Sequence, residues 1–490
     1  MAPFLPEPSA EPPGRTARMV VNKLTYGPTP GLVEQVAAMG TAAWIDQQLA
    51  PSSLPDAEGL LFQYTTLGAD NAANGFTHQF GDQKCEEELT HAALLRAVHS
   101  ERQLHEMMCA FWADHFNVFL DPRYYTWWKN QHVRTVVRNQ PLGSFSEMLM
   151  ASARSPAMLL YLDNFSSNAF AASGVNENYA RELLELHTLG IVNGAQVYDE
   201  ADVRGVAKIM TGWGFGTTNQ QFLFTAAAHS RDAVSVLGGG WSRAARTNGA
   251  GQADGESLLR FLARHRSTAR HLSWKLARRF VSDDPSAALV EQLANVYQAN
   301  DTAIGPVLRA IFDHAEFASS THRKVRRPAE QLIAVLRATA ASVDTSSSNE
   351  SADAIRLELA RLDHRMYGRV SPDGYPDGAS HWVSTDALVR RWSLAGGICG
   401  NTFTDPTTGH GIGVDTVDLL PSPLPPTVEA LLIDLADRVA GYTLTPAGAA
   451  SMCRGLQCGP SDPPAAVCSD PARRAQTLGL VLSHPSFQRR

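Results

Sequence analysis

The chain has 490 residues, of which 44% are hydrophobic and 19% charged, and these proportions are typical of a globular protein that buries its core without disulfide staples. The net charge of −7 argues against nucleic acid as the main partner, because phosphate binding needs a basic face. No stretch reaches the roughly 18 apolar residues that cross a bilayer, so no membrane span is expected.

The two ends of the chain bear on its location and redox state. Residues 1–18 form a proline-rich tail without the apolar centre of a secretory signal. A cytoplasmic protein is therefore expected, with export after signal removal as the alternative. Near the other end, Cys453, Cys458 and Cys468 lack the tight pairing of a zinc site, so one local disulfide or free thiols are expected.

Helical periodicity dominates the chain, and it predicts an all-α fold with long irregular loops and at most minor β structure. Apolar residues recur at spacings of three and four over 89–112, 145–162, 176–189, 200–213, 255–280, 287–299, 303–316, 328–342, 353–365, 384–396, 426–440 and 471–484. The clearest strand candidate is "QQFLFTA" (220–226).

The same pattern predicts how the chain is divided. We expect a main helical domain over 19–343, a flexible connector at 344–352 in a polar serine-rich run, and a C-terminal helical portion over 353–490 packed on the main domain. The short basic run "HRKVRRP" (322–328) indicates a helix start or an internal ion-pair partner. The long irregular stretch 401–427 is a candidate functional loop.

A first chemical block is "HEMMCAFWADHFNVF" (105–119), which nearly spells the zinc-protease motif H-E-x-x-H. Cys109 stands where the second histidine belongs, and this argues against such a protease. On a helical wheel His115 lies on the apolar face, as a packed core histidine or as a metal ligand. Glu106 lies on the opposite side, so it joins His115 in one site only if the helix breaks near Asp114.

A second block is the acidic helix "NENYARELLELHTLG" (176–190). Glu177, Arg181 and Glu185 form an i, i+4, i+8 ladder, which predicts ion pairs on a solvated face, with Arg181 paired to a neighbouring glutamate. Glu182 and Glu185 form an i, i+3 pair, which would place two hard oxygen ligands on one helix face, as in di-metal bundles. Both interpretations are open on spacing alone.

A third block, "YDEADVRGVAKIMTGW" (198–213), begins with a helix cap. Asp199 is the expected N-cap and Asp202 its capping-box partner, although Asp202 also faces inward and could support a neighbouring histidine. In the loop that follows, His229 has no packing explanation and is a ligand candidate, which Asp232 could orient. Further on, "GYPDGASHW" (374–382) is a rigid turn that either closes a pocket or is only structural.

Several blocks, in this order, resemble the bacterial "domain of unknown function 1800" family from about residue 19 to 490. Among them are "LTYGPTP", "FWADHFNVF", "SPAMLLYLDN", "NENYARELLELHTLG", "ADVRGVAKIMTGW", "KVRRPAEQLIAVLRA" and "SHPSFQRR". The resemblance implies that Glu182 and Glu185 belong to the family's hallmark block and that His115 belongs to its aromatic-histidine motif. It implies no assigned activity, and export is common among its members.

The leading hypothesis is a metal-dependent enzyme, of which an oxidoreductase is one form, acting on a small molecule or peptide. The ion would be iron, manganese or zinc. Its candidate ligands and catalytic residues are His115, Glu182, Glu185, His229 and Glu106 for the metal, and Asp202 and Arg181 for catalysis.

Two alternatives belong to other classes. The first is a non-catalytic scaffold that binds a partner protein through the acidic face and the aromatic run "RYYTWWKN" (123–130), since exposed tyrosine and tryptophan suit interface hot spots. The second is a haem protein with His115 or His187 as the axial ligand. The haem would be bound non-covalently, because the chain has no C-x-x-C-H attachment motif.

Overall fold

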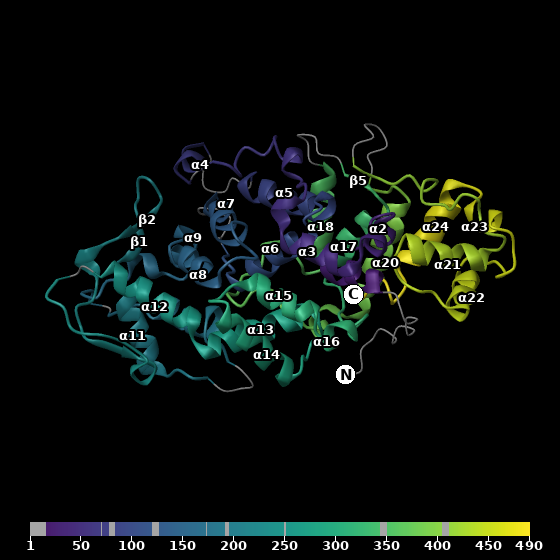
Figure 1. Cartoon of the computed structure of the whole chain (residues 1–490). Coiled ribbons are helices and arrows are strands. Elements are labelled where there is room, and N and C mark those ends of the chain that lie inside the picture. The colour runs from purple at the N-terminus through teal and green to yellow at the C-terminus, as the bar shows by residue number, and fades with distance from the viewer. Residues whose placement is uncertain are drawn as a thin grey trace.

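A computed structural model of the chain is drawn in Figure 1, and it describes residues 16–69, 71–77, 84–119, 127–172, 174–191, 196–248, 251–343, 350–403 and 411–490. Most of these residues are helical, and the strands among them form short two-stranded antiparallel sheets. The predicted all-α class is confirmed. One connected hydrophobic core extends from Met19 to Phe487.

The N-terminal helices form the centre of the molecule in Figure 1. The sequence predicts one continuous helix over 89–112, but the structure has two helices there, with a break between His99 and Gln103. The Ser100 hydroxyl accepts from Arg102 N at 3.1 Å, and the Gln103 amide donates to the carbonyls of Ala97 and Ser100, so the helix ends there. These elements are α1 (Thr16–Leu24), α2 (Leu32–Met39), α3 (Thr41–Leu49), η1 (Pro51–Ser53), η2 (Glu58–Leu60), α4 (Asn71–Thr77), α5 (Lys84–His99), α6 (Gln103–His115), α7 (Trp127–His132) and the π-helix η3 (Val133–Val137).

The middle of the chain is also more divided than its periodicity predicts. The predicted helix over 145–162 is interrupted before Pro156, because proline lacks the N–H donor that would continue the helix. The predicted helix over 255–280 is also divided, and the His265 side chain caps its second part by accepting from Ser267 N. The elements are α8 (Phe145–Ala153), α9 (Pro156–Tyr161), η4 (Asn164–Ser166), α10 (Asn178–Glu182), the π-helix η5 (Leu183–His187), α11 (Glu200–Met210), η6 (Ala226–Ala228), η7 (Leu237–Gly239), α12 (Gln252–Arg264), α13 (Arg266–Phe280), α14 (Ala287–Ala299), α15 (Ile304–Phe312) and α16 (Ala315–Ala318).

The strands are short. The predicted strand at 220–226 is confirmed as β2 (Phe222–Phe224), which pairs antiparallel with β1 (Trp213–Phe215) at the end of the molecule that carries α11 and α12 (Figure 1). The others pair as β3 (Val234–Val236) with β4 (Trp241–Arg243) and as β5 (Ser342–Val343) with β6 (Ile412–Gly413).

The C-terminal elements extend from the centre of the molecule to the end opposite β1 and β2 (Figure 1). They are α17 (Pro328–Ala338), α18 (Glu350–Arg361), α19 (Ala379–Trp382), α20 (Thr385–Cys399), α21 (Val428–Arg438), α22 (Pro446–Gly455), α23 (Ala465–Cys468) and α24 (Pro471–Leu482). Helices α20 and α24 pack closely where Gly396 and Gly479 meet. The two backbones are so near that a Cβ on Gly479 would lie 3.0 Å from the Gly396 Cα. Most of the predicted connector, residues 344–349, lies outside the described residues.

Three helices converge where the site is built. Every residue of α17 is buried, and its first turn meets the end of α6 and the second half of α13 through charged side chains. The turn after Gly374 closes on this point. Gly374 has φ of +72°, and a Cβ there would lie 2.2 Å from the carbonyl oxygen of Asp114, so a side chain does not fit.

Candidate metal centre

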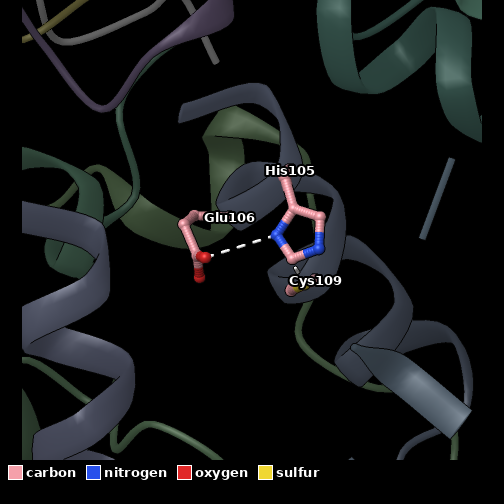
Figure 2. Close-up of side chains that lie close together, drawn as sticks. All are labelled: His105, Glu106 and Cys109. Carbon is pink, nitrogen blue, oxygen red and sulfur yellow. Dashed lines mark hydrogen bonds and ion pairs between the residues drawn. The ribbon is translucent and has the colours of Figure 1, made fainter. Parts of the chain in front are cut away.

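One turn of α6 carries three metal-ligand side chains, His105, Glu106 and Cys109, which Figure 2 shows close together. Each offers one ligand atom, and these atoms lie within 4.8 Å of one another. The described ranges of the chain contain no other group of three or more histidine, cysteine or acidic ligands this close. The i, i+4 spacing of His105 and Cys109 places both on one helix face.

Two of the three distances between these atoms suit a tetrahedral ion. His105 Nδ1 lies 3.3 Å from Glu106 Oε1 and 3.7 Å from Cys109 Sγ. A tetrahedral zinc with bonds of about 2.3 Å to sulfur and about 2.1 Å to nitrogen and oxygen would hold these pairs of atoms roughly 3.4 and 3.6 Å apart. The third pair, Glu106 and Cys109, lies within 4.8 Å, so these two side chains would move closer by up to about 1.2 Å to share one ion.

Electrostatics keep the carboxylate ionised. Burial raises the pKa of Glu106, but the Arg138 guanidinium outweighs this and holds that pKa well below its usual range. Arg138 donates two bonds of 2.7 and 2.8 Å, one to each carboxylate oxygen. Oε2 retains a second lone pair, and at Oε1 an ion would replace only the contact with His105, so the pairing with Arg138 leaves Glu106 able to act as a ligand.

The field around His105 is negative. Burial lowers the pKa of His105, but the Cys109 sulfur and the Glu106 carboxylate outweigh burial and raise it to about 9. Groups that favour a proton on this ring also favour a cation beside it.

A small cavity adjoins two of the three side chains. Its volume is about 70 Å³, and Glu106 and Cys109 line it together with Tyr26, Arg138 and Tyr367. A water molecule needs about 10 to 15 Å³ of such space, so the cavity has room for a few waters or for a small chemical group. A larger depression of about 790 Å³ lies on the surface beside α14, but none of the three ligand side chains lines it.

A cluster of buried ion pairs borders this cavity, and we call it the charged centre: Asp114, Arg279, Arg327, Glu330 and Asp377. Arg327 lies 2.6 Å from Asp114 and 3.2 Å from Glu330, while Arg279 pairs with Glu330 and, at 3.2 Å, with Asp377. Burial raises the pKa of Glu330, but its arginine partners outweigh this and hold that pKa well below its usual range. The basic run 322–328 is thus a helix start and a source of ion-pair partners, as predicted.

The acidic helix does not supply a metal centre with the predicted histidines. Its α-helical turns end at Glu182, and the chain continues as the π-helix η5. The wider turn changes the directions in which the side chains point, compared with those of an ideal α-helix. Glu185 accepts a bond from Tyr198 at 3.4 Å, and the pKa of Glu182 is raised by partial burial and by Glu185. Neither glutamate belongs to a close group of ligand atoms among the described residues.

His115 is a packed core histidine, and its assignment as a ligand is corrected. Its Nδ1 accepts from Lys275 Nζ at 2.9 Å, and its Nε2 donates to the His187 carbonyl at 3.2 Å. Burial, then Lys275, hold its pKa well below the usual range, so the ring is neutral. Both ring nitrogens are in use, which leaves no lone pair for a metal or a haem iron.

His229 follows η6 and is not part of a close group of ligand atoms among the described residues. Its Nδ1 donates to the Thr211 carbonyl at 2.9 Å, and its Nε2 lies 3.9 Å from Asp254. Two arginines, Arg243 and Arg246, pair with that carboxylate and leave little negative charge for a cation. The expected orienting residue, Asp232, pairs with Lys208 at 2.7 Å instead.

The two predicted catalytic residues have structural partners. Asp202 completes the predicted capping box with Asp199 and accepts from Leu237 N at 2.7 Å. Arg181 pairs with Glu177 at 3.5 Å, as the ladder predicts, but its closer partner is Glu200 of α11 at 2.8 Å. These contacts give both side chains a structural role, and neither lines the cavity beside the proposed metal ligands.

The described half of the aromatic run proposed as a partner surface, residues 127–130, is buried. Residues 123–126 lie outside the described part, and Trp127, Trp128 and Lys129 are buried, so they offer no exposed interface. Tyr375, by contrast, does line a pocket, as the turn over 374–382 allowed.

The sequence pattern contained a signal for the observed group. The near match to H-E-x-x-H argued only against a zinc protease, because Cys109 replaces the second histidine. Cysteine is itself a zinc ligand, so "HEMMC" still presents nitrogen, oxygen and sulfur within one turn.

Comparison with known proteins gives a family and no activity. Residues 19–489 match the family described as a protein of unknown function (DUF1800). No curated protein and no solved structure matches the chain. Among the described residues, no helix has the length and apolar character needed to cross a membrane. Because the match covers nearly the whole chain, the protein belongs to the DUF1800 family.

Proposed function

We propose that the protein is a metal-dependent enzyme that holds one ion through His105, Glu106 and Cys109. The observation that supports this most is that nitrogen, oxygen and sulfur ligand atoms lie within 4.8 Å of one another on a single helix turn. An ionised carboxylate and an adjoining cavity accompany them.

The ligand types narrow the choice of ion. Thiolate and imidazole favour zinc or iron, whereas manganese prefers oxygen ligands. Three protein ligands leave a further position for water or substrate, which is the arrangement of catalytic zinc sites. The ion would supply Lewis acidity, and iron would add redox chemistry.

Other side chains have supporting roles in this proposal. Arg138 holds the Glu106 carboxylate in place, and such outer partners fix the orientation of a ligand. The cavity beside Cys109 is small, about 70 Å³, so it would receive only the reacting group of a substrate. We propose oxidoreductase activity for the iron-loaded form, on a small molecule or the end of a peptide.

Elemental analysis of the purified protein tests the proposal. We expect about one equivalent of zinc or iron in the wild type and a loss of most of it in His105→Ala and Cys109→Ala. His99→Ala and Cys399→Ala are matched controls in other helices and should retain the metal. A wild type free of metal, or full metal content in both ligand variants, would refute the site.

A further inference from the structure

A second cavity lies on the other side of the charged centre. Its volume is about 160 Å³, and it shares Asp114, Arg327 and Tyr375 with the cavity beside the metal centre. Helix α13 contributes Trp274, Lys275 and Arg278 to its wall, and α6 contributes Phe111.

The acidic side chains around this second cavity already have partners. Asp114 pairs with Arg327 at 2.6 Å, and Asp377 lies 3.2 Å from both Arg279 and Lys324. The third, Asp373, lies 3.3 Å from Arg369. Their negative charge is therefore largely balanced before any ligand binds.

Two cations in the same wall have no carboxylate partner among the described residues. Lys275 Nζ contacts the neutral ring of His115 and lies 5.9 Å from the centre of the Phe111 ring. Arg278 stacks on Trp274 at 4.9 Å, and its Nε is buried without a hydrogen-bond partner in the described structure. The two cations are three residues apart on α13, which places them on one face of the helix.

We propose that this second cavity binds a small carboxylate-bearing molecule, with its carboxylate between Lys275 and Arg278 and its apolar body against Phe111 and Trp274. A guanidinium matches a carboxylate in shape and charge. The volume of about 160 Å³ is close to that of an engineered cavity of ~150 Å³ that admits benzene. A flat ring with one carboxylate fits these features better than inorganic phosphate, which has no apolar body to place against Phe111 and Trp274.

The protonation of Lys275 adds a second readout. Burial lowers its pKa to about 8, although Asp114, Asp377 and Asp373 raise it. The imidazoles of His115, His187 and His271 also face this region, and burial lowers the pKa of each, so they add no positive charge near neutral pH. The ammonium form attracts the carboxylate, so affinity should fall as the pH rises above about 8.

Calorimetric titration with benzoate at pH 7 tests the proposal. We expect saturable binding by the wild type and a loss of affinity of about tenfold or more in Arg278→Leu and Lys275→Met, because each removes a charged hydrogen bond. Arg270→Leu is the matched control on the same helix, since its guanidinium pairs with Glu291 and does not line this cavity. If Lys275→Met fails to fold, Arg278→Leu decides alone.

Three outcomes would overturn the assignment: no benzoate binding by the wild type, undiminished binding by Arg278→Leu, or tighter binding of inorganic phosphate than of benzoate. The site does not depend on the proposed metal. Cys109→Ala should therefore bind benzoate as the wild type does, which keeps a failure here separate from a failure of the metal centre.

Discussion

The charged centre and the acidic helix contain the same kinds of side chain in different surroundings. In the charged centre, Arg279 and Glu330 are almost fully enclosed, with side-chain exposures of 2% and 3%. At the acidic helix, Arg181 and its partner Glu200 of α11 are exposed by 39% and 62%. Water screens the exposed pair of Arg181 and Glu200 but not the enclosed pair of Arg279 and Glu330. The enclosed charges therefore interact more strongly with each other.

The contrast shows that an acidic pattern in a sequence does not by itself locate a site. Glu182 and Glu185 lie in the most distinctive acidic run. Even so, among the described residues their carboxylate oxygens belong to no close group of three or more ligand atoms. Glu106, in a mostly apolar helix, has an arginine, a histidine and a cysteine around it. Burial and convergence of neighbours distinguish the two regions.

The largest effect should come from Glu330→Gln. It leaves Arg279 and Arg327 buried beside a neutral amide, and breaking a buried pair in this way costs about 3 to 5 kcal/mol of unfolding free energy. Urea unfolding at pH 7 measures it. The same substitution at the partly exposed Glu177 is the control and should cost no more than ~0.5 kcal/mol.

The pH dependence of this stability has a definite sign. The pKa of Glu330 is lowered on folding, so its contribution is present above the unfolded carboxylate pKa, about 4.3, and is lost as the pH falls below it. The Gln variant should therefore lose part of the wild type's acid sensitivity. Equal costs for Glu330→Gln and Glu177→Gln would remove the distinction between the two regions.

An intermediate effect is expected from Arg138→Met. This variant keeps His105, Glu106 and Cys109 but removes the two bonds that orient the carboxylate. Loss of such an outer partner weakens metal affinity by about 10- to 100-fold. Competition with a chelator measures the change. An affinity equal to that of the wild type would show that Arg138 serves only the fold.

The smallest effect is expected on the acidic helix. Glu182→Gln and Glu185→Gln should each change the free energy of unfolding by no more than ~0.5 kcal/mol, as most surface substitutions do. Both variants should keep the wild-type metal content. A clear fall in bound metal in either variant would restore these glutamates as ligands and reverse the comparison.

Local patterns predicted the fold class, most helical segments, the strand at 220–226 and the capping box at Asp199, because each depends on neighbours in the chain. The surroundings of the other predicted ligands could not be predicted from such local patterns. His115 is satisfied by Lys275, 160 residues away, and the π-helix η5 alters the facing around Glu185. Neither feature follows from ideal helical geometry.

X-ray absorption at the edge of the bound metal tests the central claim most directly, because it reports the ligand atoms themselves. The metal centre predicts one sulfur neighbour at about 2.3 Å together with nitrogen and oxygen neighbours, and loss of the sulfur signal in Cys109→Ser but not in Cys399→Ser. A wild-type spectrum with only nitrogen and oxygen neighbours, or a sulfur signal that survives in Cys109→Ser, would contradict it.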